Sequence, residues 1–324
     1  MEIWMLTPAV KSTIWGGKKL IEEFGFRPDV PDADNAAEAW MLSGHKDGPC
    51  YIKNGPYTGM TLNEAIRITG RQVLGTHCEG IEGFPILIKL IDACDKLSIQ
   101  VHPGDEYARR VEHENGKTEA WYILEAKPGA ELIYGVSREL TKDEFAEDIR
   151  NNRILDDVNR VKVKAGDVVF IPSGMLHAIG EGIFLAEVQQ SSNTTYRVYD
   201  YERRDKKTGK LRELHVEKAK EVVDLTVPAV VFSSKGQPET LAGAQNTLLT
   251  DCRYFSMNRL SVNGTFEDAA DSGSFVSLLV LDGEGSLSDG IHTFALRKGV
   301  SAFIPAGFGT YRVQGDVKLL KTTV

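Results

Sequence analysis

The chain carries the segment Gly166-Asp167-Val168-Val169-Phe170-Ile171-Pro172-Ser173-Gly174-Met175-Leu176-His177. Its apolar run predicts a short buried strand, because four consecutive β-formers are bounded by turn residues. Pro172 and Gly174 then predict a turn, and the turn delivers a histidine at its end. A histidine fixed at the end of a strand and turn is a candidate metal ligand.

This spacing occurs twice in the 324 residues. The pattern Gly-x5-Pro-x-Gly-x2 ends at His177 in the first copy and at Thr310 in the second, where it runs through Gly299, Pro305 and Gly307. The interior matches as well, because Phe-Ile-Pro stands at the same place in both copies. An internal repeat of this kind predicts two units of the same architecture. Threonine replaces the histidine in the second copy, so the second unit is expected to hold no metal.

Two further strands are predicted upstream of His177. In Leu97-Ser98-Ile99-Gln100-Val101-His102 the polar residues alternate with apolar ones, which places Ser98, Gln100 and His102 on one face. In Lys117-Thr118-Glu119-Ala120-Trp121 the same periodicity places Lys117, Glu119 and Trp121 together. An inward face that carries both signs of charge is costly unless a site requires it.

Gln100, His102, Glu119 and His177 together form the candidate ligand set. Two imidazoles, a carboxylate and an amide oxygen suit zinc with one exchangeable position, and one ion per chain is expected. Two of these residues have another interpretation. Glu119 could be an exposed strand carboxylate, and the amide of Gln100 could orient a neighbouring group or a water molecule.

The spacing from Gly166 to His177 is also the second signature motif of the cupins, small antiparallel barrels that carry a metal inside. Gln-Val-His-Pro at 100–103, Gly-Lys-Thr-Glu-Ala-Trp-Tyr at 116–122 and the long run from Gln189 to Tyr201 narrow the resemblance. Together they resemble type I phosphomannose isomerase in its short bacterial form, from about residue 15 to residue 201. The expected fold is mainly β, with two cupin-like (jelly-roll) barrels, helical insertions and no metal motif in the second barrel. The expected units are residues 1–225, the metal-binding barrel, and 226–324.

The resemblance implies reversible isomerisation of mannose 6-phosphate and fructose 6-phosphate through a cis-enediol. It assigns Arg197 as the catalytic residue that faces the metal across the substrate, and it places Glu187, Lys117 and Glu38 in the cleft. Glu187 and Lys117 are both candidates for the general base. The competing interpretations are an outward strand carboxylate for Glu187 and a surface arginine paired with Asp200 for Arg197.

Lys89 and Ser98 are the residues expected to bind the phosphate. Lys89 interrupts an apolar run, so it must extend out of the core or meet an anion. An ammonium and a hydroxyl both donate hydrogen bonds to phosphate oxygens. The chain departs from the eukaryotic members of the family at Ile14, where they have an acidic residue before the tryptophan. A role assigned to that acid therefore cannot apply here.

The bulk properties restrict the remaining possibilities. A net charge of −8 argues against a general nucleic-acid surface, and no apolar run approaches the roughly 20 residues of a membrane helix. The acidic start lacks a signal-peptide core, and the four cysteines are dispersed, so a cytoplasmic location with free thiols is expected. The expected partner is a small-molecule sugar phosphate, with no nucleic acid and no membrane, on a monomer or homodimer.

Two rival functions differ in class from an isomerase. A non-catalytic sugar-phosphate-binding or regulatory cupin would bind metal and sugar phosphate without turnover. An iron-dependent oxygenase would need open positions for oxygen beside its histidines and carboxylate. Turnover without oxygen separates the isomerase from both.

Helices are predicted at residues 61–74 and 141–151, because Thr61 and Thr141 each precede a glutamate by three residues. Another short helix is expected at 105–114. Only short strand-like runs are expected near the end of the chain, including 274–281 and 310–313.

Overall fold

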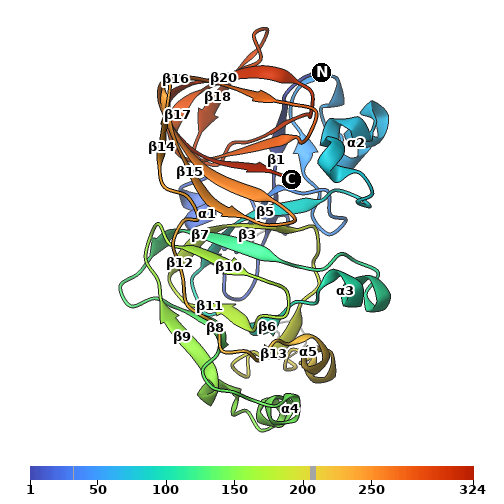
Figure 1. The fold of residues 1–324 in the computed structure, drawn as a ribbon, viewed down its shortest axis with the longest axis vertical. Coiled ribbons are helices and arrows are strands. Elements are labelled where there is room, and N and C mark those ends of the chain that lie inside the picture. Colours follow the sequence, from blue (N-terminus) through green and yellow to red (C-terminus); the bar gives the residue numbers. More distant parts are fainter. Residues whose placement is uncertain (32, 205–208) are drawn as a thin grey trace.

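The computed structural model describes residues 1–31, 33–204 and 209–324. These residues form two β-barrels stacked along the long axis of the molecule, with short helices at the periphery (Figure 1). The expected fold class is confirmed by this architecture. Among the described residues, no helix is long and apolar enough to cross a membrane.

Two antiparallel sheets face one another in the first barrel. One has the order β10 (Val168–Ile171), β7 (Glu119–Ala126), β12 (Ile183–Gln190), β5 (Ile86–Ala93), β3 (Glu38–Leu42) and β2 (Ala9–Lys11). The other has the order β13 (Tyr196–Tyr199), β6 (Ile99–Val101), β11 (His177–Ile179), β8 (Glu131–Val136) and β9 (Val158–Lys162). Each candidate metal ligand therefore lies on one of these sheets or directly after one of their strands.

The central strands of the larger sheet are buried on both faces. Every residue of β5 is buried, including Lys89. Ile88 and Leu90 belong to a core shared with Phe303 of the second barrel, whereas Ile91 packs with Trp121 inside the first barrel. One face of the sheet therefore supports the contact between the barrels, and the other face lines the interior where the candidate ligands lie.

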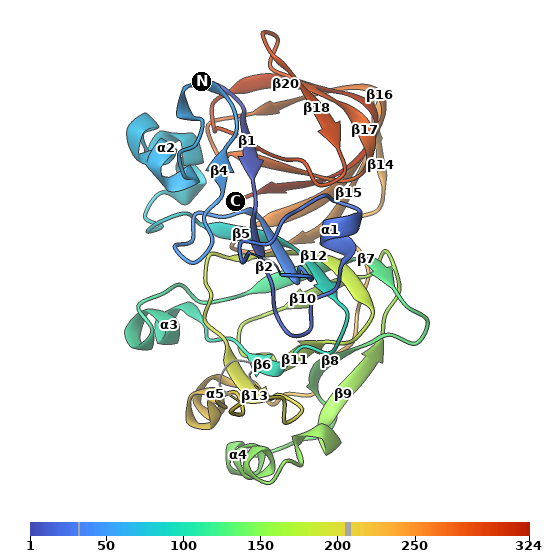
Figure 2. The same ribbon diagram turned by 180° about the vertical axis from the view of Figure 1, so that it is seen from behind.

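The second barrel is built on one long sheet. Its order is β14 (Glu239–Leu241), β15 (Ala244–Asp251), β16 (Ser256–Ala270), β20 (Gly309–Thr323), β17 (Val276–Ser288), β19 (Ser301–Ile304), β1 (Trp4–Thr7) and β4 (Tyr51–Ile52), and β18 (Thr293–Arg297) pairs with β17. Strand β1 pairs with the C-terminal strand β19 on one side and with β4 on the other (Figure 2). The sheet thus takes strands from both sides of residue 225.

Strands β16, β17 and β20 are longer than the sequence predicts. Glycines lie within these strands, and Gly264 and Gly285 both pair with Gly315 inside the sheet. A Cβ on Gly315 would lie 2.4 Å from the carbonyl oxygen of Glu284, and its φ of +138° is a conformation that side chains rarely adopt. The glycines therefore permit close pairing in the sheet, and the expectation of only short strands there was wrong.

The helical insertions are few and short. The α-helices are α1 (Lys19–Glu22), α2 (Leu62–Thr69), α3 (Asp105–Val111), α4 (Lys142–Arg150) and α5 (Val216–Val222). Single 3₁₀ turns lie at Gly55–Tyr57, Arg71–Leu74, Thr76–Cys78 and Ile154–Asp156. Both predicted capping boxes are confirmed, because Thr61 and Glu64 begin α2 and Thr141 and Glu144 begin α4 with reciprocal hydrogen bonds.

Candidate metal centre and cleft

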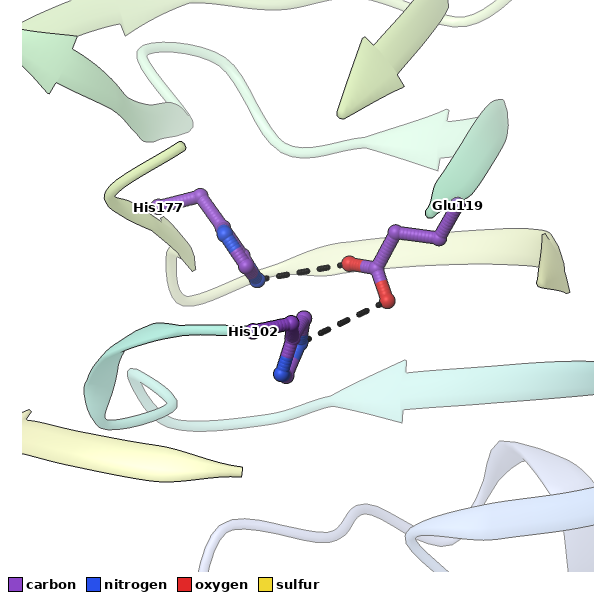
Figure 3. A group of neighbouring side chains, drawn as sticks. All are labelled: His102, Glu119 and His177. Atoms are coloured by element: carbon purple, nitrogen blue, oxygen red, sulfur yellow. Dashed lines mark ion pairs between the residues drawn. The ribbon is translucent and has the colours of Figure 1, made fainter. Parts of the chain in front are cut away.

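His102, Glu119 and His177 converge inside the first barrel (Figure 3). Their nearest ligand atoms all lie within 4.8 Å of one another. Glu119 Oε1 is 3.3 Å from His177 Nε2, and Oε2 is 3.6 Å from His102 Nε2. The three side chains come from three different strands or strand ends, so the closed barrel itself brings them together.

The backbone fixes the orientation of both imidazoles. His102 donates from Nδ1 to the carbonyl of Thr194 at 3.0 Å, and His177 donates from Nδ1 to the carbonyl of Met175 at 2.8 Å. Each ring therefore carries its proton on Nδ1 and directs the lone pair of Nε2 toward Glu119. This arrangement of a ligating histidine anchored through its other nitrogen is typical of metal sites.

The neutral state of the two histidines suits a divalent cation. Burial lowers the pKa of His177 to about 4 and lowers the pKa of His102 well below its ordinary value, so both rings are neutral near pH 7. Burial and the nearby Glu187 carboxylate raise the pKa of Glu119 to about 7. Among the described residues, neither Glu119 oxygen accepts a hydrogen bond although both are buried. A buried carboxylate that lies beside two neutral imidazoles, with the Lys117 ammonium 3.0 Å away as its counter-charge, fits a metal ligand set.

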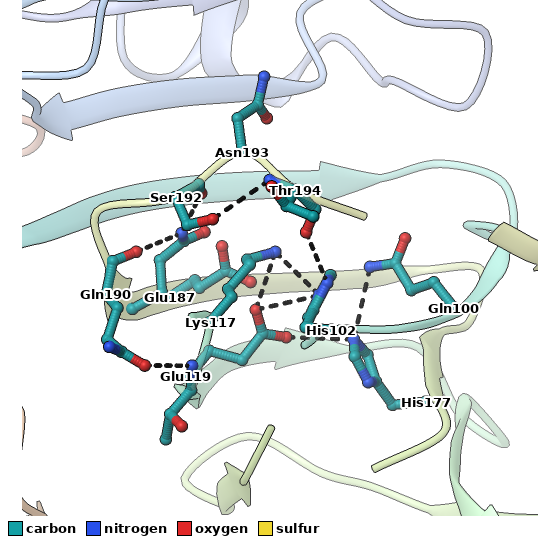
Figure 4. A network of polar contacts seen from close by, with 12 residues as sticks. Gln100, His102, Lys117, Glu119, His177, Glu187, Gln190, Ser192, Asn193 and Thr194 are labelled. Carbon is teal, nitrogen blue, oxygen red and sulfur yellow. Dashed lines mark hydrogen bonds and ion pairs between the residues drawn. The ribbon is translucent and has the colours of Figure 1, made fainter. Parts of the chain in front are cut away.

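Gln100 and Lys117 border this group (Figure 4). Gln100 Nε2 lies 3.4 Å from His177 Nε2, and a half turn of the amide would present its oxygen there instead. Lys117 Nζ lies 2.9 Å from His102 Nε2 and 3.0 Å from Glu119 Oε2. The structure thus places Gln100 within reach of the predicted fourth ligand position.

A cleft of about 360 Å³ opens above the centre. Its lining includes every residue for which the sequence suggested a catalytic or substrate-binding role: Glu38, Lys89, Ser98, Lys117, Glu187 and Arg197. Trp15 and Trp121 also line it. The geometry therefore gathers residues from β3, β5, β12, β13 and the β6 and β7 segments around one space large enough for a sugar.

Two carboxylates neutralise Lys89 within the cleft. Its Nζ lies 2.9 Å from Glu187 Oε1 and 3.6 Å from Glu38 Oε2. Burial alone would lower the pKa of Lys89, but the attraction of Glu187 and Glu38 outweighs it and raises that pKa. Burial likewise opposes ionisation of Glu187, yet Lys89, Lys117 and the hydrogen bond from Trp121 lower its pKa. Glu187 therefore faces inward as a carboxylate, not outward as the competing interpretation required.

Arg197 reaches the same cleft from β13. Its backbone N–H donates to His215 Nδ1 at 3.1 Å, and its Nη1 donates to the carbonyl of Glu213 at 3.0 Å. Its buried Nε has no hydrogen-bond partner in the described part of the chain. The alternative in which Arg197 pairs with Asp200 is wrong, because Asp200 accepts hydrogen bonds from Arg203 and Arg212.

Sequence reasoning missed several residues that line the cleft: Thr13, Asn193, Thr195 and Arg212. Arg212 follows a strongly charged run that has no periodicity. Its pairing with buried Asp200, 2.6 Å from Arg212 Nε, holds it at the cleft. No pattern in the sequence could have identified that contact.

Comparisons with known proteins place this geometry in a family. Residues 3–146 match the family model of the type I phosphomannose isomerase catalytic domain, and residues 244–324 match the mannose-6-phosphate isomerase cupin domain. The mannose-6-phosphate isomerase ManA of Bacillus subtilis is 39% identical over 311 residues, covering 95% of this chain and 94% of the relative. The chain belongs to the type I phosphomannose isomerase family.

Other comparisons agree with this membership. A mannose-6-phosphate isomerase of Streptococcus mutans is 36% identical and covers 95% of this chain and 93% of its own length. The crystal structure of the mannose 6-phosphate isomerase from Bacillus subtilis has a TM-score of 0.90, 37% identity and full coverage of both chains. A zinc-bound mannose 6-phosphate isomerase structure, 16% identical, shares the fold with a TM-score of 0.78 over 99% of each chain. The expected resemblance and enzyme class, an aldose–ketose isomerase, are confirmed.

Proposed function

We propose that this chain interconverts mannose 6-phosphate and fructose 6-phosphate at one zinc ion held by Gln100, His102, Glu119 and His177. The observation that carries the proposal is the buried Glu119 carboxylate. It lies between two histidines whose Nε2 atoms face its oxygens and whose Nδ1 atoms are each bound to a backbone carbonyl. When bound, zinc supplies a Lewis acid that stabilises negative charge on substrate oxygens.

The cleft residues supply the other requirements of the reaction. Moving a proton between C2 and C1 through a cis-enediol builds negative charge on O1 and O2. Arg197 lines the cleft with no carboxylate paired to it among the described residues, so its charge is available to those oxygens. A guanidinium donates two parallel hydrogen bonds to adjacent oxygens, which favours the planar enediol over the bound sugar.

Glu187 is our choice for the base. Both candidates line the cleft and both make an ion pair, Glu187 with Lys89 and Lys117 with Glu119. An ionised carboxylate has a lone pair that accepts a proton, whereas an ammonium has none. Lys117 would then act as a donor to a substrate oxygen. A cation on the ligand set would repel the Lys117 ammonium and favour its extension into the cleft.

Lys89 and Ser98 remain our proposal for the phosphate, although two carboxylates already pair with Lys89. Arg212, which also lines the cleft, is the second cation that could meet the phosphate.

Metal analysis combined with a panel of aldose and ketose phosphates tests the function. We expect one zinc per chain and turnover of mannose 6-phosphate without oxygen. His177→Ala should lose both zinc and activity, and the internal repeat offers Thr310→Ala as a matched control that keeps both. A parent that binds sugar phosphate but does not turn it over would support the regulatory alternative. Two zinc ions per chain would contradict the assignment of the second barrel.

A further inference from the structure

The backbone that leads into Glu119 is held at three successive N–H groups. Gly116 donates to Asp105 Oδ1 at 2.9 Å, Lys117 to the carbonyl of Pro103 at 3.0 Å, and Thr118 to Gln190 Oε1 at 2.9 Å. These bonds fix the segment immediately before a candidate ligand. The side chains of Lys117 and Glu119 therefore depend on them for their positions.

Asp105 is the centre of this support. Its Oδ1 accepts from Gln190 Nε2 at 3.0 Å as well as from Gly116, so two of the three anchors trace back to one carboxylate. The packing allows little slack, because a Cβ on Gly116 would lie 2.5 Å from the backbone nitrogen of Asp105. A small rotation of the Asp105 side chain would therefore shift the backbone that positions Glu119.

The second barrel fixes the orientation of Asp105. Tyr254, between β15 and β16, donates its hydroxyl to Asp105 Oδ2 at 3.1 Å. The Tyr254 ring packs against the core that the two barrels share. The turn that holds the tyrosine is closed by a hydrogen bond from the Cys252 N–H to the Phe255 carbonyl, at 3.0 Å. A tyrosine of the barrel without a metal motif therefore contacts the carboxylate that supports the metal-binding strand.

We propose that Tyr254 is a positioning residue that sets the affinity of the first barrel for its metal through Asp105 and the 116–118 backbone. The inference rests on the proposed zinc site. The second barrel then influences metal binding in the first barrel without supplying a metal ligand itself. A tyrosine that merely joined the two barrels would contribute to stability and leave metal affinity unchanged.

A pair of tyrosine-to-phenylalanine variants separates these roles. Tyr254→Phe removes only the hydroxyl that reaches Asp105. Tyr311→Phe removes a hydroxyl of the same kind, which donates to Asp268 Oδ2 at 2.7 Å within the second barrel. Both variants lose one hydroxyl-to-carboxylate bond, but only the first lies on the route to the metal centre. Zinc affinity by chelator competition, kcat and KM, and the urea midpoint would be measured for each.

We expect Tyr254→Phe to weaken zinc binding about 3- to 10-fold. The loss should be moderate because the Tyr254 hydroxyl binds Asp105, and Asp105 in turn binds the backbone that precedes Glu119. Tyr311→Phe should leave zinc affinity within twofold of the parent, whatever it does to the urea midpoint. Asp105→Ala should lose more affinity, and adding Tyr254→Phe to it should change little further. Equal zinc affinities for the parent, Tyr254→Phe and Tyr311→Phe would overturn this inference alone. A parent that binds no zinc would overturn the proposed function and the inference with it.

Discussion

Replacement of Arg197 by lysine tests the catalytic cation most directly. The substitution keeps a positive charge and a long aliphatic stem, but it removes the planar fork. In the structure Nη1 is already bound to the Glu213 carbonyl, and the buried Nε has no partner within the described residues. The free donors of the guanidinium are therefore the ones available to O1 and O2.

The expected loss follows from those donors. Removing one preorganised donor to a developing oxyanion costs about 2.7–4 kcal/mol, or roughly 10²–10³ in kcat. Because the charge on the oxygens is larger in the transition state than in the bound sugar, the loss should fall on kcat more than on KM. Zinc content and the urea midpoint should stay near those of the parent, since Arg197 is no part of the ligand set.

A coupled assay of mannose 6-phosphate turnover measures the effect, with Arg203→Lys as the control. Arg203 is another arginine close in sequence to Arg197, but its guanidinium binds Asp200 at 2.6 Å and it does not line the cleft. The control should keep near-parental kcat. If Arg197→Lys works at more than half the parental rate, Arg197 is not the catalytic cation and the placement of the substrate is wrong.

The remaining predictions concern the proton and the protonation states. In heavy water, fructose 6-phosphate formed from mannose 6-phosphate should carry deuterium at C1, and a complete lack of label over many turnovers would favour a hydride shift over the enediol. Glu187→Gln should abolish this exchange, whereas Lys117→Gln should slow turnover and leave some exchange; the reverse order would make Lys117 the base. Burial, together with the nearby charge of Arg197, lowers the pKa of His215 in the folded protein below its ordinary value of 6.5. The stability that neutral His215 provides is therefore fully present above pH 6.5, and it is lost as the pH falls through the folded-state pKa. In His215→Asn, the amide oxygen can accept the Arg197 hydrogen bond that Nδ1 accepts in the parent. The urea midpoint of this variant should fall less than that of the parent between pH 7.5 and pH 5. An equal fall in both proteins would count against this role of His215. Thr141→Ala should cost about 1 kcal/mol by urea unfolding through loss of its helix cap, without changing kcat.

The sequence predicted the features that depend on local periodicity. Alternation placed Glu119 and Lys117 on one face, and the Pro/Gly turn placed His177 at the start of β11, where it pairs with Gln100. The capping boxes likewise predicted the starts of α2 and α4, because a capping box depends on two residues that are only three positions apart.

Contacts between distant segments could not be predicted in this way. Asp105 lies at the start of a helix with ordinary helix-forming neighbours, and nothing near it in the sequence indicates Tyr254. Arg212 reaches the cleft because Asp200 holds it there, and the charged run before it has no pattern. The lengths of β16, β17 and β20 could not be predicted either, since their residues pair with partners on other strands.

Strand β1 has a consequence for the order in which a newly made chain can fold. Its residues Trp4 to Leu6 pair with Phe303 to Ser301, so β1 leaves the ribosome almost 300 residues before the strand with which it pairs. The next strand, β2, pairs instead with β3 in the other barrel. The first barrel can close while synthesis continues, but the second sheet stays open at that edge until residues near 300 have emerged. A chain cut at residue 225 would therefore yield a C-terminal fragment that lacks β1 and β4, with an exposed edge open to other chains.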